Sequence, residues 1–401
     1  MVREAYRKVR SNKGSAGVDQ VDLKIFDEKL SKNLYKIWNR MASGSYFPSP
    51  VKEVIIPKPT GGERKLGIPT VSDRIAQQVI KSYLEPRLEK EFTSNSYGYR
   101  PHKSAHQALE SVKENTRKYA WVIDMDIKSF FDELNHELLL KALDQHVPEE
   151  WVKMYIRRWL QAPIQTTQGL ERKDGKGTPQ GGVISPLLAN LFLHYVIDKW
   201  IAKRFPTVSI IRYADDIIIH CISEAQCRYM LQSIKARLLE CKLQLSESKT
   251  KIVYCRDHRR ICQNNYPKSF DFLGHSFKPM SKKSNKGGLF LGYDCEISKK
   301  ARSKIIAEWK AQNFHRQSTC NLQDIANKLN PKIMGIINFY GKMNKFAVQR
   351  LFHHLDYRLA KWVKNKFKGV RNSYQKANDW LREIKSSYPN IFYHWQLFAT
   401  T

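Results

Sequence analysis

The chain contains few of the signals that mark secreted, membrane-bound or disulfide-bonded proteins. Its first residues, MVREAYRKVRSNKG, contain no apolar h-region and so do not read as a secretory signal. The most apolar long stretch, Val183 to Val196, is interrupted by polar residues and a proline, so it does not span a bilayer. The seven cysteines are odd in number and form no CxxC pair, which argues against a disulfide framework and a zinc knuckle. These absences predict a reducing compartment.

Positive charge is the main feature of the composition. The 69 Lys and Arg residues exceed the 38 Asp and Glu residues and give a net charge of +31. Such an excess indicates the kind of partner rather than the fold, and a polyphosphate chain is the obvious partner. An acidic membrane surface is the alternative, but we find neither a lipidation signal nor a separate basic amphipathic helix. Apolar residues make up 42% of the chain, enough for buried cores, and the length predicts two or three domains.

The apolar pattern predicts alternating helices and strands, followed by a mainly helical C-terminal part. The predicted strands lie in hairpins at 51–69 and around 215, in a strand at 120–127, and in a short strand pair at 251–255 and 270–275. The predicted helices lie at 1–40, 72–92, 133–146, 148–161, 186–202 and 223–242, and from 296 onward. The Lys-, Ser- and Gly-rich stretch at 279–288 changes the character of the chain, so we expect a domain boundary at 279–295.

Two adjacent carboxylates occupy the tight turn of the hairpin around 215. The segment Tyr213-Ala214-Asp215-Asp216 lies between two apolar, β-branched runs. Such turns normally contain Asn-Gly or Asp-Gly, because their central residues need positive φ. Two like charges beside a buried hairpin are unfavourable unless something positive neutralises them. A bound divalent metal would supply that charge; a solvated acidic turn is the alternative.

A second acidic strand end lies upstream, at Asp124 and Asp126. Side chains alternate along a strand, so these two carboxylates face the same side. Either could meet the Asp215–Asp216 turn if the two strands are neighbours in one sheet. Carboxylates from separate strands that hold two Mg²⁺ ions about 3.5–4 Å apart are what phosphoryl transfer to a 3′-hydroxyl requires.

Six motifs in a fixed order resemble those of the reverse transcriptases encoded by group II introns. They lie at 56–74 (IPK…RKLGIPTVSDR), 92–101 (F…SYGYRP), 126–131 (Asp126 with Phe131), 177–190 (GTPQGGVISPLLAN), 213–216 (YADD) and 272–274 (FLG). The resemblance extends over almost the whole chain. It implies an α+β right-hand polymerase, with fingers and an antiparallel palm sheet, followed by an α-helical thumb or maturase domain. The implied domains are 1–120 for the fingers with part of the palm, 121–280 for the palm, and 290–401 for the thumb or maturase (X) domain.

The resemblance also implies roles for individual residues. The implied metal ligands for two Mg²⁺ ions, with Mn²⁺ able to replace them, are Asp126, Asp215, Asp216 and the backbone carbonyl of Ile127. The implied nucleotide contacts are Lys58, Arg64, Phe131 and Gln180, with Phe131 as the steric gate that excludes a 2′-hydroxyl. The implied template and primer contacts are Asn12, Lys13, Arg100, Pro179, Gly181 and Tyr213. Asp124 occupies an apolar or variable position in most relatives, so we do not expect it to be a direct ligand.

Each implied nucleotide contact has a structural alternative. Phe131 would otherwise be a core aromatic, and Lys58 and Arg64 would be the solvated edge of a hairpin. Gln180 would lie in an ordinary turn.

The C-terminal part contains a further motif, 329–340 (LNPKIMGIINFY), which resembles the maturase domain, although Ile336 stands where a Trp is frequent. Basic helices with interspersed aromatic residues suit RNA, through phosphate contacts and stacking. An ordinary helical bundle with core aromatics is the alternative. No Cys/His cluster follows residue 370, so we expect a relative of the bacterial type without an endonuclease, located in the cytoplasm. The chain begins almost at the family's first motif, so we expect no preceding helix.

Three functions remain open at this point. The first is an RNA-directed DNA polymerase that adds dNTPs to a DNA or RNA primer on an RNA template and binds its intron RNA to assist splicing and mobility. The second is a non-catalytic RNA-binding maturase. The third is a domesticated polymerase in phage defence, repair or a CRISPR-linked system. Intact acidic residues at 126, 215 and 216 favour the first.

Overall fold

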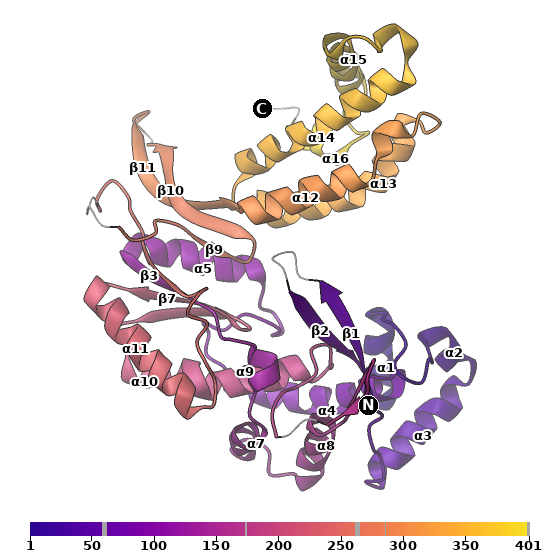
Figure 1. Cartoon of the computed structure of the whole chain (residues 1–401), viewed down its shortest axis with the longest axis vertical. Coiled ribbons are helices and arrows are strands. Elements are labelled where there is room, and N and C mark those ends of the chain that lie inside the picture. The colour runs from indigo at the N-terminus through magenta and orange to yellow at the C-terminus, as the bar shows by residue number, and fades with distance from the viewer. Residues whose placement is uncertain (58–61, 173–174, 261–264, 285, 399–401) are drawn as a thin grey trace. The chain divides into compact units, whose positions relative to one another are not determined.

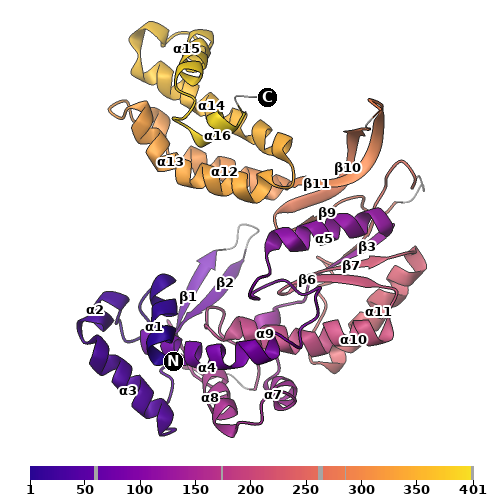
Figure 2. The ribbon, with the colours of Figure 1, turned by 180° about the vertical axis from the view of Figure 1, so that it is seen from behind.

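The computed structural model describes residues 1–57, 62–172, 175–260, 265–284 and 286–398. The chain forms two compact units, Met1–Ile252 and Val253–Thr401, each described separately below. Figures 1 and 2 show the elements of both units from opposite sides.

The first part of the N-terminal unit contains helices that pack against one another, and a four-stranded sheet. The helices are α1 (Val2–Ser11), α2 (Leu23–Glu28), α3 (Leu30–Ala42) and α4 (Val71–Leu88). The sheet has the order β2-β1-β4-β5 and consists of β1 (Val51–Pro57), β2 (Glu63–Ile68), β4 (Ile164–Thr166) and β5 (Gly169–Glu171). Helix α4 is buried along most of its length, and the Thr70 side chain caps its first turn by accepting a hydrogen bond from the Asp73 amide.

A second four-stranded sheet forms the centre of the N-terminal unit. Its order is β6-β7-β3-β8, and its strands are β3 (Trp121–Met125), β6 (Ser209–Tyr213), β7 (Asp216–Cys221) and β8 (Lys251–Tyr254). Strand β7 pairs antiparallel with both β6 and β3. Helices α5 (Ala105–Lys118) and α11 (Glu224–Glu240) pack against it from opposite faces (Figures 1 and 2). Coverage of both faces explains why the strands are continuous apolar runs rather than alternating ones.

The remaining helices of this unit connect its two sheets. They are α6 (Phe130–Glu133), α7 (His136–Asp144), α8 (Glu150–Leu160), α9 (Ser185–Leu193), the π-helix η1 (His194–Asp198) and α10 (Lys199–Arg204). The sequence predicts one helix at 186–202. The structure interrupts that helix with a single π-helical turn, which an apolar periodicity does not reveal.

The C-terminal unit combines a small antiparallel sheet with a helical bundle. The sheet has the order β11-β10-β9 and consists of β9 (Phe270–Phe272), β10 (His275–Lys283) and β11 (Leu289–Ile297). The helices are α12 (Lys299–Ala311), η2 (Phe314–Arg316), α13 (Leu322–Ile336), η3 (Ile337–Gly341), α14 (Lys345–Lys366), η4 (Lys368–Val370), α15 (Tyr374–Ser387) and α16 (Tyr393–Phe398).

Two expectations about this region differ from the structure. The predicted pairing of 251–255 with 270–275 is wrong, because β8 belongs to the β3 sheet and β9 pairs with β10. A tight turn at Leu273 and Gly274, both with positive φ, folds β9 back onto β10. The expected boundary at 279–295 falls on the β10–β11 hairpin, and the compact units divide earlier, after Ile252. The division into fingers, palm and thumb stays a prediction.

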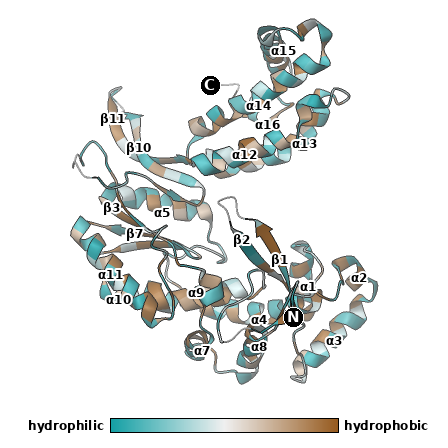
Figure 3. Cartoon of the chain, viewed as in Figure 1, coloured by the Kyte–Doolittle hydropathy of each residue, from teal (hydrophilic) through white to brown (hydrophobic). Residues whose placement is uncertain are grey.

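The aromatic side chains of the C-terminal bundle are mostly core. Trp309, Phe352 and Trp362 are buried, whereas Tyr357 is exposed. Figure 3 shows hydrophilic residues alternating with hydrophobic ones along these helices, as expected for amphipathic helices around a shared core. Core packing therefore accounts for most of the aromatic residues that the sequence associates with RNA.

None of the helices in the described part of the chain has the length and apolar character that crossing a membrane requires. Of the six cysteines within the described residues, five are buried and Cys320 is half-buried.

We expect Leu351→Ala to destabilise the C-terminal bundle. Leu351 is fully buried within the core cluster on α14, and truncating such a side chain leaves a cavity that costs about 2–5 kcal/mol. Urea denaturation measures the change in unfolding free energy. Tyr388→Ala, at a residue that is 61% exposed, is the matched control and should cost less than about 0.5 kcal/mol. Equal effects of the two substitutions would contradict the assignment of the core.

Candidate active site

A cavity of about 950 Å³ lies within the N-terminal unit, and polar and charged side chains dominate its lining. It brings together seven residues that the sequence assigns to metal or nucleotide: Arg64, Asp126, Ile127, Phe131, Gln180, Asp215 and Asp216. Its other wall comes from the segment 244–249 and from Lys235 and Leu239 of α11. Residues far apart in the sequence thus share one space.

The β6–β7 hairpin places two of the acids at the cavity. Tyr213 pairs with Asp216 across the strands, so Ala214 and Asp215 form a two-residue turn. Ala214 has a φ of +56°, a conformation in which glycine is the usual residue. An alanine in this conformation is strained, and the surrounding structure must hold it in place.

Strand pairing places the third acid beside this turn. Met125, the last residue of β3, pairs with Ile217 on β7, and Asp126 follows immediately. The backbone of Asp126 is held on its other side, because its carbonyl accepts a hydrogen bond of 2.9 Å from the Ser246 amide. Its amide donates to the Thr250 hydroxyl at 3.3 Å. The strands of Asp126 and of the acidic turn are therefore neighbours, as the sequence requires for a shared site.

The three carboxylates repel one another. The pKa of Asp215 is raised, first by burial and then by the charge of Asp126. The pKa of Asp216 is raised to about 6 by burial and by the charges of Asp215 and Asp126. Arg64 and Lys249 act in the opposite direction on both groups. The site thus concentrates more negative charge than its own cations neutralise.

Lys249 is a site residue that the sequence reasoning missed. Its ammonium group lies 3.0 Å from Oδ2 of Asp126 and also lines the cavity. The segment ESKTK is simply a polar, basic stretch in the sequence, and only the pairing of β8 with β3 brings it to the acids. By contrast, Asp124 lies 4.0 Å from Lys251 and does not line the cavity.

Glycines join the β1–β2 hairpin to the loop that contains Gln180. The Gly67 amide donates a 2.7 Å hydrogen bond to the Gln180 carbonyl. Gly181 has a φ of +121°, and a Cβ there would lie 2.4 Å from the Gly67 carbonyl oxygen. The glycine in this loop therefore allows the loop backbone to lie against the backbone of the β1–β2 hairpin. This contact positions Arg64, on β2, and Gln180 at the same cavity. The predicted contact Lys58 lies outside the described residues.

Phe131 stands on a short helix at the cavity wall. Ser129, with a φ of +46°, turns the chain into α6. The Phe131 carbonyl accepts a 2.8 Å hydrogen bond from the Thr178 amide, and its ring meets the buried Phe130 ring edge-on at 5.3 Å. The ring is thus supported from behind and reaches the cavity, rather than being enclosed in the core.

The predicted template and primer contacts do not line the cavity. Asn12 and Lys13 are exposed at the end of α1. Pro179 and Gly181 flank the lining residue Gln180 in the chain, and Tyr213 pairs with the lining residue Asp216 across the β6–β7 hairpin. These contacts stay predictions.

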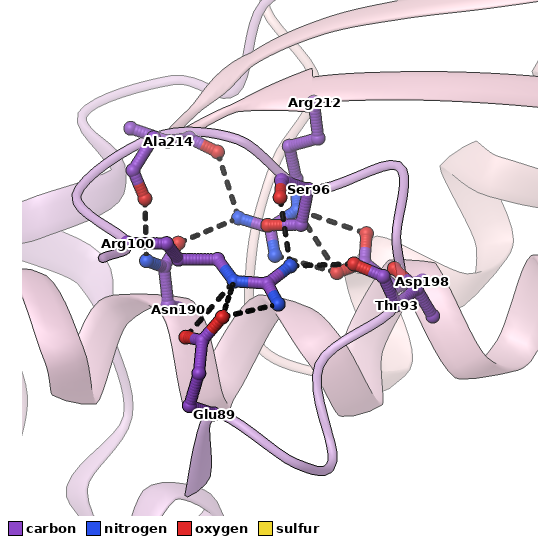
Figure 4. Close-up of polar contacts among 9 residues, drawn as sticks. Glu89, Thr93, Ser96, Arg100, Asn190, Asp198, Arg212 and Ala214 are labelled. Atoms are coloured by element: carbon purple, nitrogen blue, oxygen red, sulfur yellow. Dashed lines mark hydrogen bonds and ion pairs between the residues drawn. The ribbon is translucent and has the colours of Figure 1, made fainter. Parts of the chain in front are cut away.

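Arg100 has internal partners for its guanidinium group. It bonds both carboxylate oxygens of Glu89 and the carbonyls of Thr93 and Ser96, and its side chain is 5% exposed (Figure 4). The structure therefore supports a role in holding the 93–100 loop. A contact between Arg100 and nucleic acid stays a prediction.

The donor set suits a hard divalent cation in its chemistry, because such ions prefer carboxylate and carbonyl oxygens. Burial, and after it the charges of the neighbouring carboxylates, raises the pKa values of Asp215 and Asp216, and a bound cation would favour their charged forms. Within the described ranges, however, no group of three or more His, Cys, Asp or Glu side chains is arranged to hold a metal ion. Oδ2 of Asp126 is paired with Lys249, so an ion that binds this oxygen would replace the ammonium group.

We expect Asp216→Asn to stabilise the metal-free protein above pH 6. The folded-state pKa of about 6 exceeds the ordinary value of 3.8, so the folded protein binds this proton more tightly than the unfolded chain. The resulting stability is complete below pH 3.8 and is lost as the pH rises through about 6. Because water in the cavity screens the charge, the gain should be about 1 kcal/mol.

Chemical denaturation at pH 8 and pH 4, with a chelator present, measures this effect. The two proteins should differ at pH 8 and converge at pH 4. Asp379→Asn, which removes an exposed carboxylate paired with Arg382, is the control and should change little. A less stable Asp216→Asn protein at pH 8 would contradict the proposed repulsion.

Comparison with known families gives a consistent result. The family model "Reverse transcriptase (RNA-dependent DNA polymerase)" matches residues 56–277, more than half of the chain. The model "Group II intron, maturase-specific domain" matches residues 302–380. The first match includes the cavity-lining residues from Glu63 to Lys249, and the second lies within the helical bundle.

Two proteins are similar in sequence over two thirds of this chain or more. Protein YkfC of Escherichia coli strain K12 is 32% identical over 319 residues, which cover 68% of this chain and 78% of that protein. The group II intron-encoded protein LtrA of Lactococcus lactis subsp. cremoris is 26% identical, over 91% of this chain and 73% of that protein. A solved structure of telomerase from Candida albicans, in complex with a fragment of telomeric RNA, is 12% identical with a TM-score of 0.48, over 90% of this chain and 65% of that chain.

The predicted fold class is therefore confirmed: an α+β polymerase of the right-hand type with an antiparallel palm sheet, followed by a helical maturase domain. The chain belongs to the reverse transcriptase family and resembles the bacterial proteins in which a group II intron maturase domain follows the polymerase.

Proposed function

We propose that this protein synthesises DNA on an RNA template by adding dNTPs to the 3′-hydroxyl of a primer. The observation that supports this most directly is the convergence of Asp126, Asp215 and Asp216 on one cavity that also contains Arg64, Phe131 and Gln180. A scaffold that only binds RNA has no need to crowd three carboxylates whose charges destabilise one another.

Different side chains would bind the metal ions and the triphosphate. Two Mg²⁺ ions, held by the three carboxylates and the carbonyl of Ile127, would lower the pKa of the primer hydroxyl and neutralise the leaving pyrophosphate. Arg64, on β2, would offer a planar fork of donors to the triphosphate, and Lys58, which lies outside the described residues, would offer a point charge. Both cations offset the negative charge of the incoming nucleotide before bond formation begins.

Phe131 and Gln180 would select and position the incoming nucleotide. The Phe131 ring, supported by Phe130, would lie beneath the sugar and collide with a 2′-hydroxyl. Gln180 lines the same cavity and is held by the glycine contact to the β1–β2 hairpin. A rigid loop of this kind places the nucleotide without adding charge.

We propose that the C-terminal unit binds group II intron RNA and so assists splicing and mobility. The maturase-specific match at 302–380 supports this, and so does the net charge of +31, which core packing does not require. A domesticated polymerase in phage defence, repair or a CRISPR-linked system would use the same active site on a different RNA.

Asp215→Ala should abolish cDNA synthesis in primer extension on an RNA template, because it removes a carboxylate on which the proposed metal site depends. Asp126→Asn should have a similar effect. Asp124→Asn is a matched control, because Asp124 lies on β3 two residues before Asp126 and does not line the cavity. This variant should retain activity. Full activity of Asp215→Ala would contradict the assignment of these acids as metal ligands.

Phe131→Ala should admit ribonucleotides. Removing the ring opens space beneath the sugar, so incorporation of rNTPs relative to dNTPs should rise by at least about tenfold, the effect of little more than 1 kcal/mol. Single-nucleotide extension with each nucleotide type measures the ratio of kcat/KM values. Phe131→Tyr, which keeps the ring, should keep the discrimination. An unchanged ratio for Phe131→Ala would remove this residue from sugar selection.

A further inference from the structure

A fully buried arginine lies three residues before Asp215. Arg212, on β6, is 0% exposed, and its Nε donates a 2.8 Å hydrogen bond to Oδ1 of Asp198. Its Nη2 donates to the other oxygen of the same carboxylate. Its Nη1 donates to Oδ1 of Asn190 at 2.9 Å and to the carbonyl of Ala214 at 3.0 Å (Figure 4). One guanidinium group thus joins a helix, a π-helical turn and the acidic turn.

The contact with Ala214 determines the orientation of the turn. The Ala214 carbonyl belongs to the peptide that links Ala214 to Asp215, so a donor fixed on this oxygen fixes the peptide plane that carries Asp215. Ala214 holds the strained φ of +56°. Such a conformation persists only where the surroundings over-determine it, and Arg212 supplies one of the constraints.

The loop at 95–98 supplies the other constraints. The Arg212 backbone is bonded on both sides to this loop, since its amide donates to the Asn95 carbonyl at 2.9 Å and its carbonyl accepts from the Tyr97 amide at 2.8 Å. Asn190 donates from Nδ2 to the Gly98 carbonyl at 2.7 Å. A Cβ on Gly98 would lie 2.4 Å from the Ala214 nitrogen. The loop therefore lies directly against the turn, with no room for a side chain between them.

Stability alone does not explain the charges in this network. Burying Arg212 and Asp198 costs several kcal/mol of desolvation per ion in real proteins, and replacing such a pair by apolar residues is often neutral or stabilising. Apolar residues could not donate to the Ala214 carbonyl or to Asn190. Asp198 is also the last residue of the π-helix η1, and π-helical turns occur frequently at functional sites.

We propose that Arg212, oriented by Asp198 and Asn190, is a positioning residue that holds the Asp215–Asp216 turn in its reactive geometry. The inference rests on the proposed polymerase function. Arg212 touches neither nucleotide nor primer, and it acts through the peptide between Ala214 and Asp215. Its loss should therefore slow the reaction while leaving substrate binding largely intact.

The test is the double variant Arg212→Leu/Asp198→Leu, which removes both buried charges together. Its maximal rate of single-nucleotide extension should fall about 100-fold, the effect of a misplacement of about 1 Å. The KM for dNTP and the affinity for template–primer should stay within about twofold of the wild-type values. Circular dichroism and the thermal midpoint should stay close to those of the wild-type protein. A folded double variant with the wild-type rate overturns the proposal, as does a rise in KM at an unchanged maximal rate.

Arg212→Lys decides the question if the double variant does not fold. A lysine keeps the ion pair with Asp198 but cannot donate to Asp198, Asn190 and the Ala214 carbonyl as a fork. The folded Arg212→Lys protein should therefore be slower than wild type at an unchanged KM, and a wild-type rate overturns the proposal. Lys153→Met is the matched control: Lys153 is also buried and paired with acids, Asp144 and Glu150, on α7 and α8. The Lys153→Met protein should have the maximal rate of single-nucleotide extension of the wild type.

The outcomes also separate this inference from the proposed function. Absence of cDNA synthesis by the wild-type protein, or full activity of Asp215→Ala, counts against the polymerase assignment itself. An active wild type, an inactive Asp215→Ala and a fully active double variant count against the positioning role alone.

Discussion

The antiparallel pairing of β3 with β7 is the interaction on which the site depends. It places Asp126 beside the Asp215–Asp216 turn and so creates a concentration of negative charge at one edge of a sheet. Burial, together with the charges of the neighbouring carboxylates, raises the pKa values of Asp215 and Asp216. A fold that maintains such repulsion needs strong support around it, and a ligand of opposite charge relieves it.

That support comes from close backbone contacts rather than from bulk packing. Gly181 lies against Gly67, and Gly98 lies against Ala214, each at a distance that excludes a Cβ. The buried Arg212 connects the turn to α9 and to the π-helical turn η1. Together these contacts keep the hairpin of Arg64, the loop of Gln180 and the acidic turn around one cavity. Catalytic geometry of this kind depends on rigid elements whose positions are determined by neighbours outside the site.

The two compact units differ in the chemistry they present. The N-terminal unit contains the cavity and most of the match to the reverse transcriptase family, whereas the C-terminal unit contains the maturase-specific match on a helical bundle. In the bundle, Trp309, Phe352 and Trp362 belong to the core, so the proposed recognition of RNA there would fall mainly to exposed cationic side chains. Phosphate contacts of that kind give affinity with little sequence information.

The sequence by itself determined the family, the strand–turn–strand around Asp215 and the acid at the end of β3, because continuous apolar, β-branched runs and short polar turns are local signals. It also placed Arg64, Phe131 and Gln180 at the site, through motif order. The tertiary structure alone decided which strands pair. In the folded chain β8 lies beside β3, and Lys249 therefore lies next to Asp126. Only the folded chain shows that Arg212 is fully buried and that the Arg100 guanidinium group bonds to groups within the protein. Pairing and burial arise from contacts between residues distant in the chain, and no local pattern encodes them.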